Sequence, residues 1–91
     1  MNILRLVGSN VRTARLRKGL SQEALANEAG VAMNYVSGIE RGMQNPTVMV
    51  LHRLATVLGI QEAKLFAPIS SQGAPPRNLA PGRKAKTTKV Q

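Results

Sequence analysis

The 91-residue sequence contains no cysteine, no tryptophan and no aspartate, and it has a single histidine. The absence of cysteine excludes disulfide bonds and every zinc finger that uses a thiolate ligand. One histidine and four glutamates do not supply a carboxylate dyad with a base, a metal cluster or a nucleophilic triad within one chain. The composition therefore predicts a protein that is not an enzyme and that needs no metal or other cofactor.

Acidic residues are also scarce, because four acids stand against 13 lysines and arginines and the net charge is +9. Such an excess attracts polyanions, with nucleic acid as the first candidate and an anionic membrane surface as the alternative. Aromatic residues make up only 2% of the chain, whereas proteins that bind single strands or RNA usually stack bases on several rings. No apolar run approaches the roughly 18 residues that span a bilayer. Duplex DNA is the expected partner, and no membrane span is expected.

The composition changes at Pro68, and four of the five prolines lie from this residue onward. Too few apolar residues follow to offset the entropy of ordering this segment. We therefore expect a folded domain over residues 1–67 and a disordered Pro/Gly-rich tail over residues 68–91. The tail is basic and contains no acid, so it either adds nonspecific phosphate contacts or acts as a passive solubilising segment.

Within residues 1–67 the apolar side chains recur three and four positions apart, which is typical of amphipathic helices. Ser21 and Thr47 are expected helix N-caps, and glycines supply helix stops. The predicted fold is all-α, with helices over about residues 4–18, 21–29, 33–41, 47–58 and 61–66.

The link between the second and third expected helices has only three residues, which is too short for an antiparallel hairpin of a bundle. The two helices must therefore cross steeply. Gly30 tolerates the positive φ that such a turn requires, and Ala26 is small enough for a close approach. This pattern predicts helix-turn-helix geometry.

Five segments of the sequence form an ordered set with characteristic gaps: Leu20–Ala26, Gly30-Val31, Tyr35–Gly42, Asn45–Thr47 and Leu54–Gly59. Together they resemble the phage-repressor-like (Cro/C1, XRE) DNA-binding family. The resemblance covers about residues 3–67. It implies a five-helix lambda-repressor-like domain. Within this family, the segment Tyr35–Arg41 is similar to the controller proteins of restriction-modification systems.

The resemblance implies that the third helix enters the major groove and that the second lies across it, with its start against the phosphate backbone. Asn34 can accept from N6 and donate to N7 of an adenine. No arginine or glutamine precedes Arg41 on this face, which disfavours strong guanine readout and allows modest or shape-based specificity. The expected base-reading residues are Ala32, Met33, Asn34, Ser37 and Gly38. The expected phosphate-binding residues are Ser21, Gln22, Tyr35, Arg41, Asn45 and Thr47.

Several of these residues also have purely structural interpretations. Met33 can fill a gap in the packing, Asn34 and Gln22 can be solvated polar residues, and Ser21 is already explained as a cap. The resemblance implies an ion pair between Arg15 and Glu40, and a phosphate contact is the alternative role for Arg15. His52 is expected to be a surface or interface histidine with no metal co-ligand.

A single short helix reads few base pairs, so we expect a homodimer on a palindromic operator with half-sites about 34 Å apart. Ile60, Leu65 and Phe66 are the expected dimer interface. The expected function is a cytoplasmic, nucleoid-associated transcriptional regulator. The alternative is an antitoxin-type module that regulates its own operon while the tail contacts a protein partner such as a toxin.

Overall fold

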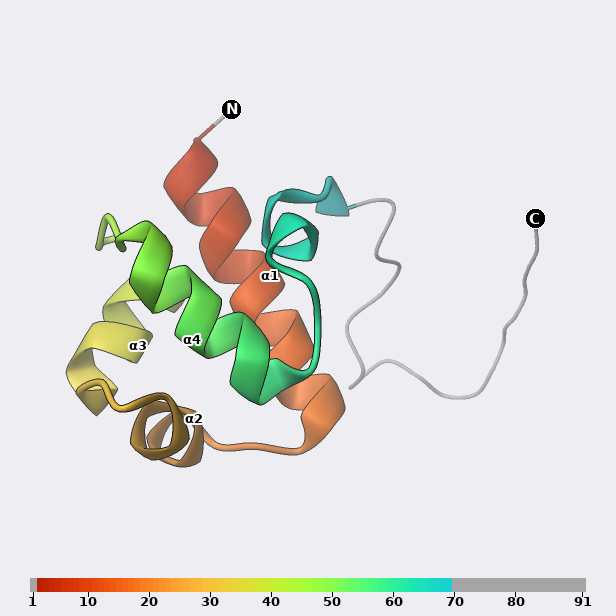
Figure 1. The fold of residues 1–91 in the computed structure, drawn as a ribbon. Helices are drawn as coiled ribbons and strands as arrows, with labels where there is room; N and C mark the ends of the chain where they lie inside the picture. Colours follow the sequence, from red (N-terminus) through yellow and green to blue (C-terminus); the bar gives the residue numbers. More distant parts are fainter. Residues whose placement is uncertain (1, 70–91) are drawn as a thin grey trace.

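The computed structural model describes residues 2–69 of the chain. These residues form four α-helices and one short 3-10 helix, with no strand among them (Figure 1). The elements are α1 (Ile3–Lys18), α2 (Gln22–Ala29), α3 (Met33–Glu40), α4 (Val48–Leu58) and η1 (Glu62–Phe66). The all-helical expectation is confirmed. The short fifth helix expected over residues 61–66 takes the 3-10 form.

Residues 70–91 lie outside the part of the chain that the structure describes. Three expectations concern these residues and stay predictions: the disorder of the tail, its added phosphate contacts and its contact with a protein partner. Within residues 2–69, no helix is both long enough and apolar enough to cross a membrane.

Three helices begin at a side chain that accepts from the free backbone N–H groups of the first turn. The hydroxyl oxygen of Ser21 accepts from the amide of Ala24 at 3.0 Å, and that of Thr47 accepts from the amide of Val50 at 3.1 Å. Both caps are as predicted. Asn2 caps α1 in the same way, although the sequence analysis did not assign it. These caps satisfy donors that would otherwise lack a partner, which explains why the helices begin where they do.

The core lies between the inward faces of all four helices and η1, and it holds α2 and α3 against α1 and α4. Leu25, Val36, Ile39 and Leu54 are almost completely buried at its centre. Ala26 is 1% exposed where α2 packs against α3, as expected for a small residue at a close approach. The other buried apolar residues are Val7, Val11, Ala29, Leu51, Ala55, Leu58 and Leu65.

Two polar side chains, one from α1 and one from α4, hold η1 in place. The buried side-chain amide of Asn10 in α1 donates to the carbonyl oxygens of Leu65 and Ala67, both at 2.8 Å. On the surface, Nδ1 of His52 in α4 lies 2.5 Å from Oε2 of Glu62. This hydrogen bond lowers the pKa of Glu62 below its usual value. His52 is exposed, as expected for a surface histidine.

The backbones of α1 and α3 meet at Gly8. A Cβ atom at this position would lie 2.2 Å from the carbonyl oxygen of Ile39 and 2.8 Å from that of Glu40. Only a residue without a side chain allows this approach. Gly8 therefore fixes how closely the C-terminal end of α3 lies against α1.

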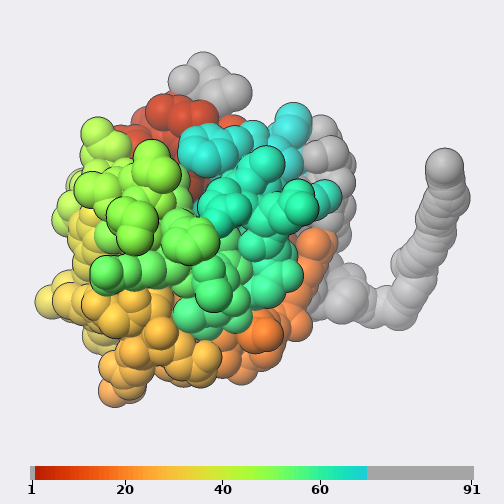
Figure 2. Space-filling model, viewed as in Figure 1, coloured from red at the N-terminus to blue at the C-terminus, as the bar shows by residue number. Residues whose placement is uncertain are grey.

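Large apolar side chains remain exposed on the first turns of α1 and α4 and at the end of η1. Figure 2 shows that these three segments come together on one face of the molecule. Val48 is 80% exposed and Met49 is 59% exposed. We call Ile3, Val48, Met49 and Phe66 the apolar cluster. This surface has no partner within the described part of the chain.

Candidate nucleic-acid interface

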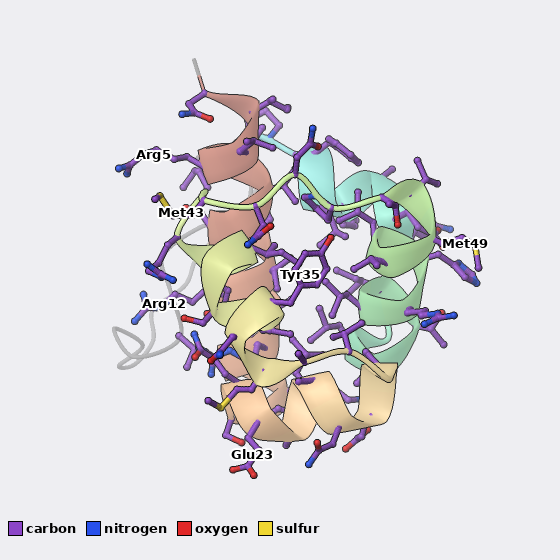
Figure 3. All side chains as sticks on the ribbon, turned by 90° about the vertical axis from the view of Figure 1, so that its left-hand side faces the viewer. Arg5, Arg12, Glu23, Tyr35, Met43 and Met49 are labelled. Atoms are coloured by element: carbon purple, nitrogen blue, oxygen red, sulfur yellow. The ribbon has the colours of Figure 1, made fainter. Side chains whose placement is uncertain are left out.

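Helices α2 and α3 are joined by three residues and cross at a steep angle, as Figure 3 shows. Gly30 has φ of 74°, a left-handed conformation that costs a glycine little. The amide of Val31 then donates to the carbonyl oxygen of Ala26 at 3.0 Å, which closes the turn. Leu25 of α2 and Val36 of α3 are both buried, so both helices are anchored in the hydrophobic core where they cross. This is the predicted helix-turn-helix arrangement.

The outer face of α3 presents uncharged side chains to solvent. Asn34 is exposed, Ser37 is half-buried, and Ala32 and Met33 at the start of the helix are exposed. Because Val36 and Ile39 occupy the opposite face in the core, the exposed side chains are directed away from the domain. Met33 is 46% exposed and is not a core residue.

Gly38 lies one turn from Asn34 on the outer face of α3 but is buried, so the expectation that its backbone is exposed to a base is wrong. Its cover is the side chain of Gln44, from the loop that joins α3 to α4. A Cβ atom at Gly38 would lie 2.6 Å from Cγ of Gln44 and 3.5 Å from its Cδ and Nε2. Gln44 therefore occupies the place that a side chain at position 38 would take, one turn from Asn34 on the outer face of α3.

Gln44 was not among the predicted site residues, because it lies six residues beyond Gly38 and on a loop. The one local signal for Gln44 is Gly38, a glycine on the outer face of an amphipathic helix. Such a glycine is consistent either with close approach of a ligand or with a neighbouring side chain that fills the space. The structure shows the second of these.

A bidentate ion pair joins α1 to the end of α3. Nε of Arg15 lies 2.7 Å from Oε2 of Glu40, and Nη2 lies 3.0 Å from Oε1. Nη1 of Arg15 also donates to the carbonyl oxygen of Leu20, at 2.9 Å, in the turn before α2. The two side chains are 10% and 3% exposed. The pair that the resemblance implied is present, and it occupies the guanidinium in structural contacts.

Gln22 extends this network to the start of α2. Its Nε2 donates to Oε1 of Glu40 at 3.0 Å, and the residue is half-buried rather than simply exposed. One hydrogen of the amide is therefore held by Glu40, while the same nitrogen carries a second hydrogen. The ion pair thus orients a donor at the N-terminus of α2, which is the position expected for a phosphate contact.

The loop between α3 and α4 gathers most of the other expected phosphate-binding residues. Arg41, Asn45 and Thr47 are exposed around it, and the hydroxyl of Thr47 is engaged as the cap of α4. Tyr35 is half-buried and packs against the core, and Figure 3 places its ring in the space framed by α3, α4 and this loop. The loop therefore brings together a cation, polar side chains and a helix N-terminus.

Arg5 is a further cation at this loop that the sequence analysis did not assign. A Cβ atom at Gly42 would lie 2.8 Å from Cγ of Arg5, so the arginine stem packs directly beneath the loop. Figure 3 shows Arg5 and Arg12 projecting from α1 on the same side of α3. Nothing in the local sequence separates Arg5 from the other basic residues of α1, because its placement depends on the packing of a distant loop.

The expected dimer-interface residues do not lie together on the surface. Leu65 is fully buried in the core and is excluded from an interface between subunits. Ile60 is half-buried against the core, and Phe66 is 46% exposed. Of the three, Phe66 alone is a member of the apolar cluster.

The sequence of this domain matches a known family over residues 11–65, and that family is described as helix-turn-helix. The chain belongs to the HTH_3 family. The matched region begins within α1 and runs to η1, and it includes all of α2, the turn, α3 and α4. The XRE-type resemblance seen in the sequence is thereby confirmed.

The HTH_3 chain is 43% identical over 68 residues to y4dJ, an uncharacterized HTH-type transcriptional regulator of Sinorhizobium fredii, covering 75% of this chain and 88% of that protein. It is 43% identical to the restriction-modification controller protein C.AhdI from Aeromonas hydrophila, with a TM-score of 0.68 over 69% of this chain and 96% of that one. It is 35% identical to the N-terminal DNA binding domain of SinR from Bacillus subtilis, with a TM-score of 0.67 over 71% and 96% of the two chains.

Some other curated regulators are longer, and the chain spans half of their length or less. The family and these relatives identify the HTH_3 protein as a DNA-binding transcriptional regulator and not an enzyme. The similarity to controller proteins, expected from the segment Tyr35–Arg41, is also confirmed.

Proposed function

We propose that this protein is a sequence-specific regulator that binds a palindromic operator as a homodimer, with α3 of each subunit in the major groove. The observation that supports this most directly is the division of α3 into two faces. Val36 and Ile39 are buried on one face, and Asn34 is exposed on the other. The major groove accommodates an α-helix and displays a distinct donor and acceptor pattern for each base pair.

Base contacts are assigned to the uncharged outer surface of α3. Asn34 supplies a carboxamide that can pair with N6 and N7 of an adenine. Gln44 supplies a second carboxamide on the same surface, because it lies over Gly38. Ala32 and Met33 offer apolar contacts to thymine methyl groups, and Ser37 offers a hydroxyl.

Phosphate contacts are assigned to the two edges of this surface. At one edge, Gln22 presents its remaining N–H at the start of α2, beside Ser21. At the other edge lie Arg41, in the loop between α3 and α4, and Arg5 of α1, which packs beneath this loop. Asn45, Thr47 and Tyr35 complete this second group. Contacts of this kind set the register of the protein on DNA without specifying sequence.

Substituting Asn34→Ala should relax specificity at a single base pair, with a cost of about 1–3 kcal/mol for the preferred base. The reason is that the carboxamide is lost while the helix surface keeps its shape. The measurement is selection of bound duplexes from a random pool, followed by affinities for single-base variants of the selected site. Asn27→Ala, an exposed asparagine on α2, is the matched control and should leave the preferred sequence unchanged.

An equal loss of affinity for all sequences would assign Asn34 to the phosphate backbone. A selected site without two-fold symmetry would contradict the palindromic operator. Both outcomes are read from the same experiment, because the selected sequences report base preference, symmetry and spacing together.

Two copies of α3 are needed because one eight-residue helix contacts few base pairs. The apolar cluster supports dimer formation, since an exposed group of large apolar side chains on several elements is typical of a protein interface. In this proposal the apolar cluster, which includes Phe66, forms the contact between subunits. Half-sites would then be separated by about 34 Å, one turn of DNA, or by a multiple of it.

Substituting Met49→Glu should convert the dimer to a monomer, because it places a charge in the apolar contact. Operator affinity should fall at least about 100-fold, since the second half-site no longer contributes. Sedimentation velocity and operator titration measure the two effects. Thr56→Glu places the same charge on the exposed face of α4 two turns farther along, outside the apolar cluster, and should change neither. A wild-type protein that is monomeric at micromolar concentration yet binds its operator tightly would contradict the proposal.

A further inference from the structure

One exposed face of α1 carries a row of polar side chains that includes two arginines. Arg5, Ser9 and Arg12 are four and three residues apart, so they share one face of the helix, and all three are exposed. Val7 and Val11, which point elsewhere, are buried in the core. Helix α1 contains no acidic residue. We call Arg5, Ser9 and Arg12 the α1 ridge.

The two arginines of the α1 ridge are not neutralised within the described domain. Among residues 2–69, the guanidinium groups of Arg5 and Arg12 form no ion pair or hydrogen bond. Arg15, one turn beyond Arg12, is instead held by Glu40. Seven residues separate the two ridge arginines, about 10 Å along the helix axis, and both charges face solvent. This face of α1 therefore has a positive potential.

The α1 ridge lies beside the C-terminal end of α3. Gly8, which lies between the two ridge arginines in the sequence, is where α1 meets the carbonyl oxygen of Ile39. The stem of Arg5 also packs against Gly42, in the loop after α3. Figure 3 shows that Arg5 and Arg12 both project outward past the same edge of α3. The ridge therefore continues the surface formed by α3 and the loop that follows it.

The width of the major groove determines what the neighbours of α3 can contact. An α-helix with its side chains is about 10–12 Å across, and the major groove is about 12 Å wide. A helix in the groove therefore fills it, and elements packed beside that helix lie over the sugar-phosphate backbone at the border of the groove. In the placement proposed above, the α1 ridge is such a neighbour, and its arginines face phosphates.

We propose that the α1 ridge binds the DNA backbone next to each half-site, outside the base pairs that α3 reads. This inference rests on the proposed function, because it requires α3 in the major groove. DNA is favoured over an acidic protein as the partner, because the ridge lacks the large apolar or aromatic side chain that anchors most protein interfaces. Ser9 lies between the two arginines, and its hydroxyl, like a guanidinium, can donate to a phosphate oxygen.

Substituting Arg12→Gln should reduce the salt dependence of operator binding. The slope of log affinity against log salt concentration should become shallower by about 2, because the dimer loses one phosphate contact from each subunit. Arg5→Gln should have the same effect while it keeps Cγ, the atom that packs against Gly42. The sequence preferred in duplex selection should stay unchanged, because phosphate contacts carry no sequence information.

Arg53→Gln is the matched control for the change in net charge. Arg53 is an exposed arginine of α4 and lines a hollow between α2 and α4 in which no residue of α1 takes part. Its substitution should leave the slope unchanged, because Arg53 contacts no phosphate in this placement. All three variants should melt like the wild-type protein, because each replaced side chain is exposed.

Ethylation interference locates the contacts on the DNA. An ethyl group on a single phosphate should weaken wild-type binding at positions just beyond the base pairs that the selection identifies. With Arg12→Gln, interference at these flanking phosphates should weaken. Interference at the phosphates assigned to Gln22 and Arg41 should remain.

The proposal is overturned if Arg12→Gln and Arg53→Gln change the slope to the same extent, because net charge alone would then explain the effect. An unchanged slope for Arg12→Gln also overturns it and assigns the ridge to a partner other than DNA. Either result leaves a selected palindromic site, and with it the proposed function, intact. If selection with the wild-type protein yields no palindromic site, the proposed function fails and the ridge proposal fails with it.

Discussion

Replacing Glu40 with alanine should lower the free energy of unfolding by about 3–5 kcal/mol, the range seen when one partner of a buried ion pair is removed. The side chain of Glu40 is 3% exposed and accepts from Arg15 at 2.7 and 3.0 Å. Without it, the guanidinium stays buried and keeps its hydrogen bond to the carbonyl oxygen of Leu20, but it has lost its counter-charge. A domain of this size has a free energy of unfolding of roughly 3–10 kcal/mol, so most of its stability would be lost.

Urea denaturation followed by circular dichroism measures this effect. Glu28→Ala removes an exposed glutamate from α2 and should change the stability by less than about 0.5 kcal/mol. A loss for Glu40→Ala no greater than for Glu28→Ala would show that the ion pair does not hold α1 against α3.

Replacing both members of the pair, with Arg15→Met and Glu40→Leu, should restore most of the lost stability because no buried charge is left without a partner. The double variant also removes the acceptor that orients Gln22. It should therefore fold and yet bind operator DNA more weakly than the wild-type protein. If the restored protein binds DNA with wild-type affinity, the contact between Gln22 and Glu40 has no role in the interface.

The fold was predictable because its boundaries are set by local chemistry. Ser21 and Thr47 cap their helices within three residues, and Gly30 ends α2 through its own backbone conformation. The ion pair between Arg15 and Glu40 could be predicted only from the resemblance to a known family, because 25 residues separate its two members. The exposed position of Asn34 followed from the spacing of Val36 and Ile39 along α3.

The errors arose where a contact depends on how two distant segments meet. Leu65 and Phe66 are adjacent and both apolar, and a five-residue segment has too little periodicity to show which one faces the core. The structure buries Leu65 and leaves Phe66 partly exposed. Gln44 lies over Gly38 because a loop folds back onto α3, and Asn10 is buried because two carbonyl oxygens from η1 and its end reach it. No local pattern encodes either contact.

Substituting Gly8→Ala should destabilise the domain by about 3 kcal/mol, at the upper end of the usual cost of overpacking. In a helix interior this change alone would add about 1 kcal/mol of stability, because alanine has the higher helix propensity. Here the added Cβ would lie 2.2 Å from the carbonyl oxygen of Ile39, which is a backbone atom of α3 and cannot rotate away. Helix α1 must therefore move away from α3, which also strains the ion pair that joins the same two helices.

Gly38→Ala is the matched control, because it is the same chemical change in another helix with an apparent steric conflict at 2.6 Å. The atom in conflict is Cγ of Gln44, which belongs to a flexible side chain on an exposed loop. The stability of this variant should stay within about 1 kcal/mol of the wild type, because helix propensity and the displacement of Gln44 act in opposite directions. Its selected DNA sequence should change, since Gln44 no longer lies beside Asn34. Thermal denaturation and duplex selection on both variants distinguish a glycine that allows backbone contact, Gly8, from one that leaves room for a side chain, Gly38. Equal losses of stability in the two variants would contradict the backbone contact at Gly8.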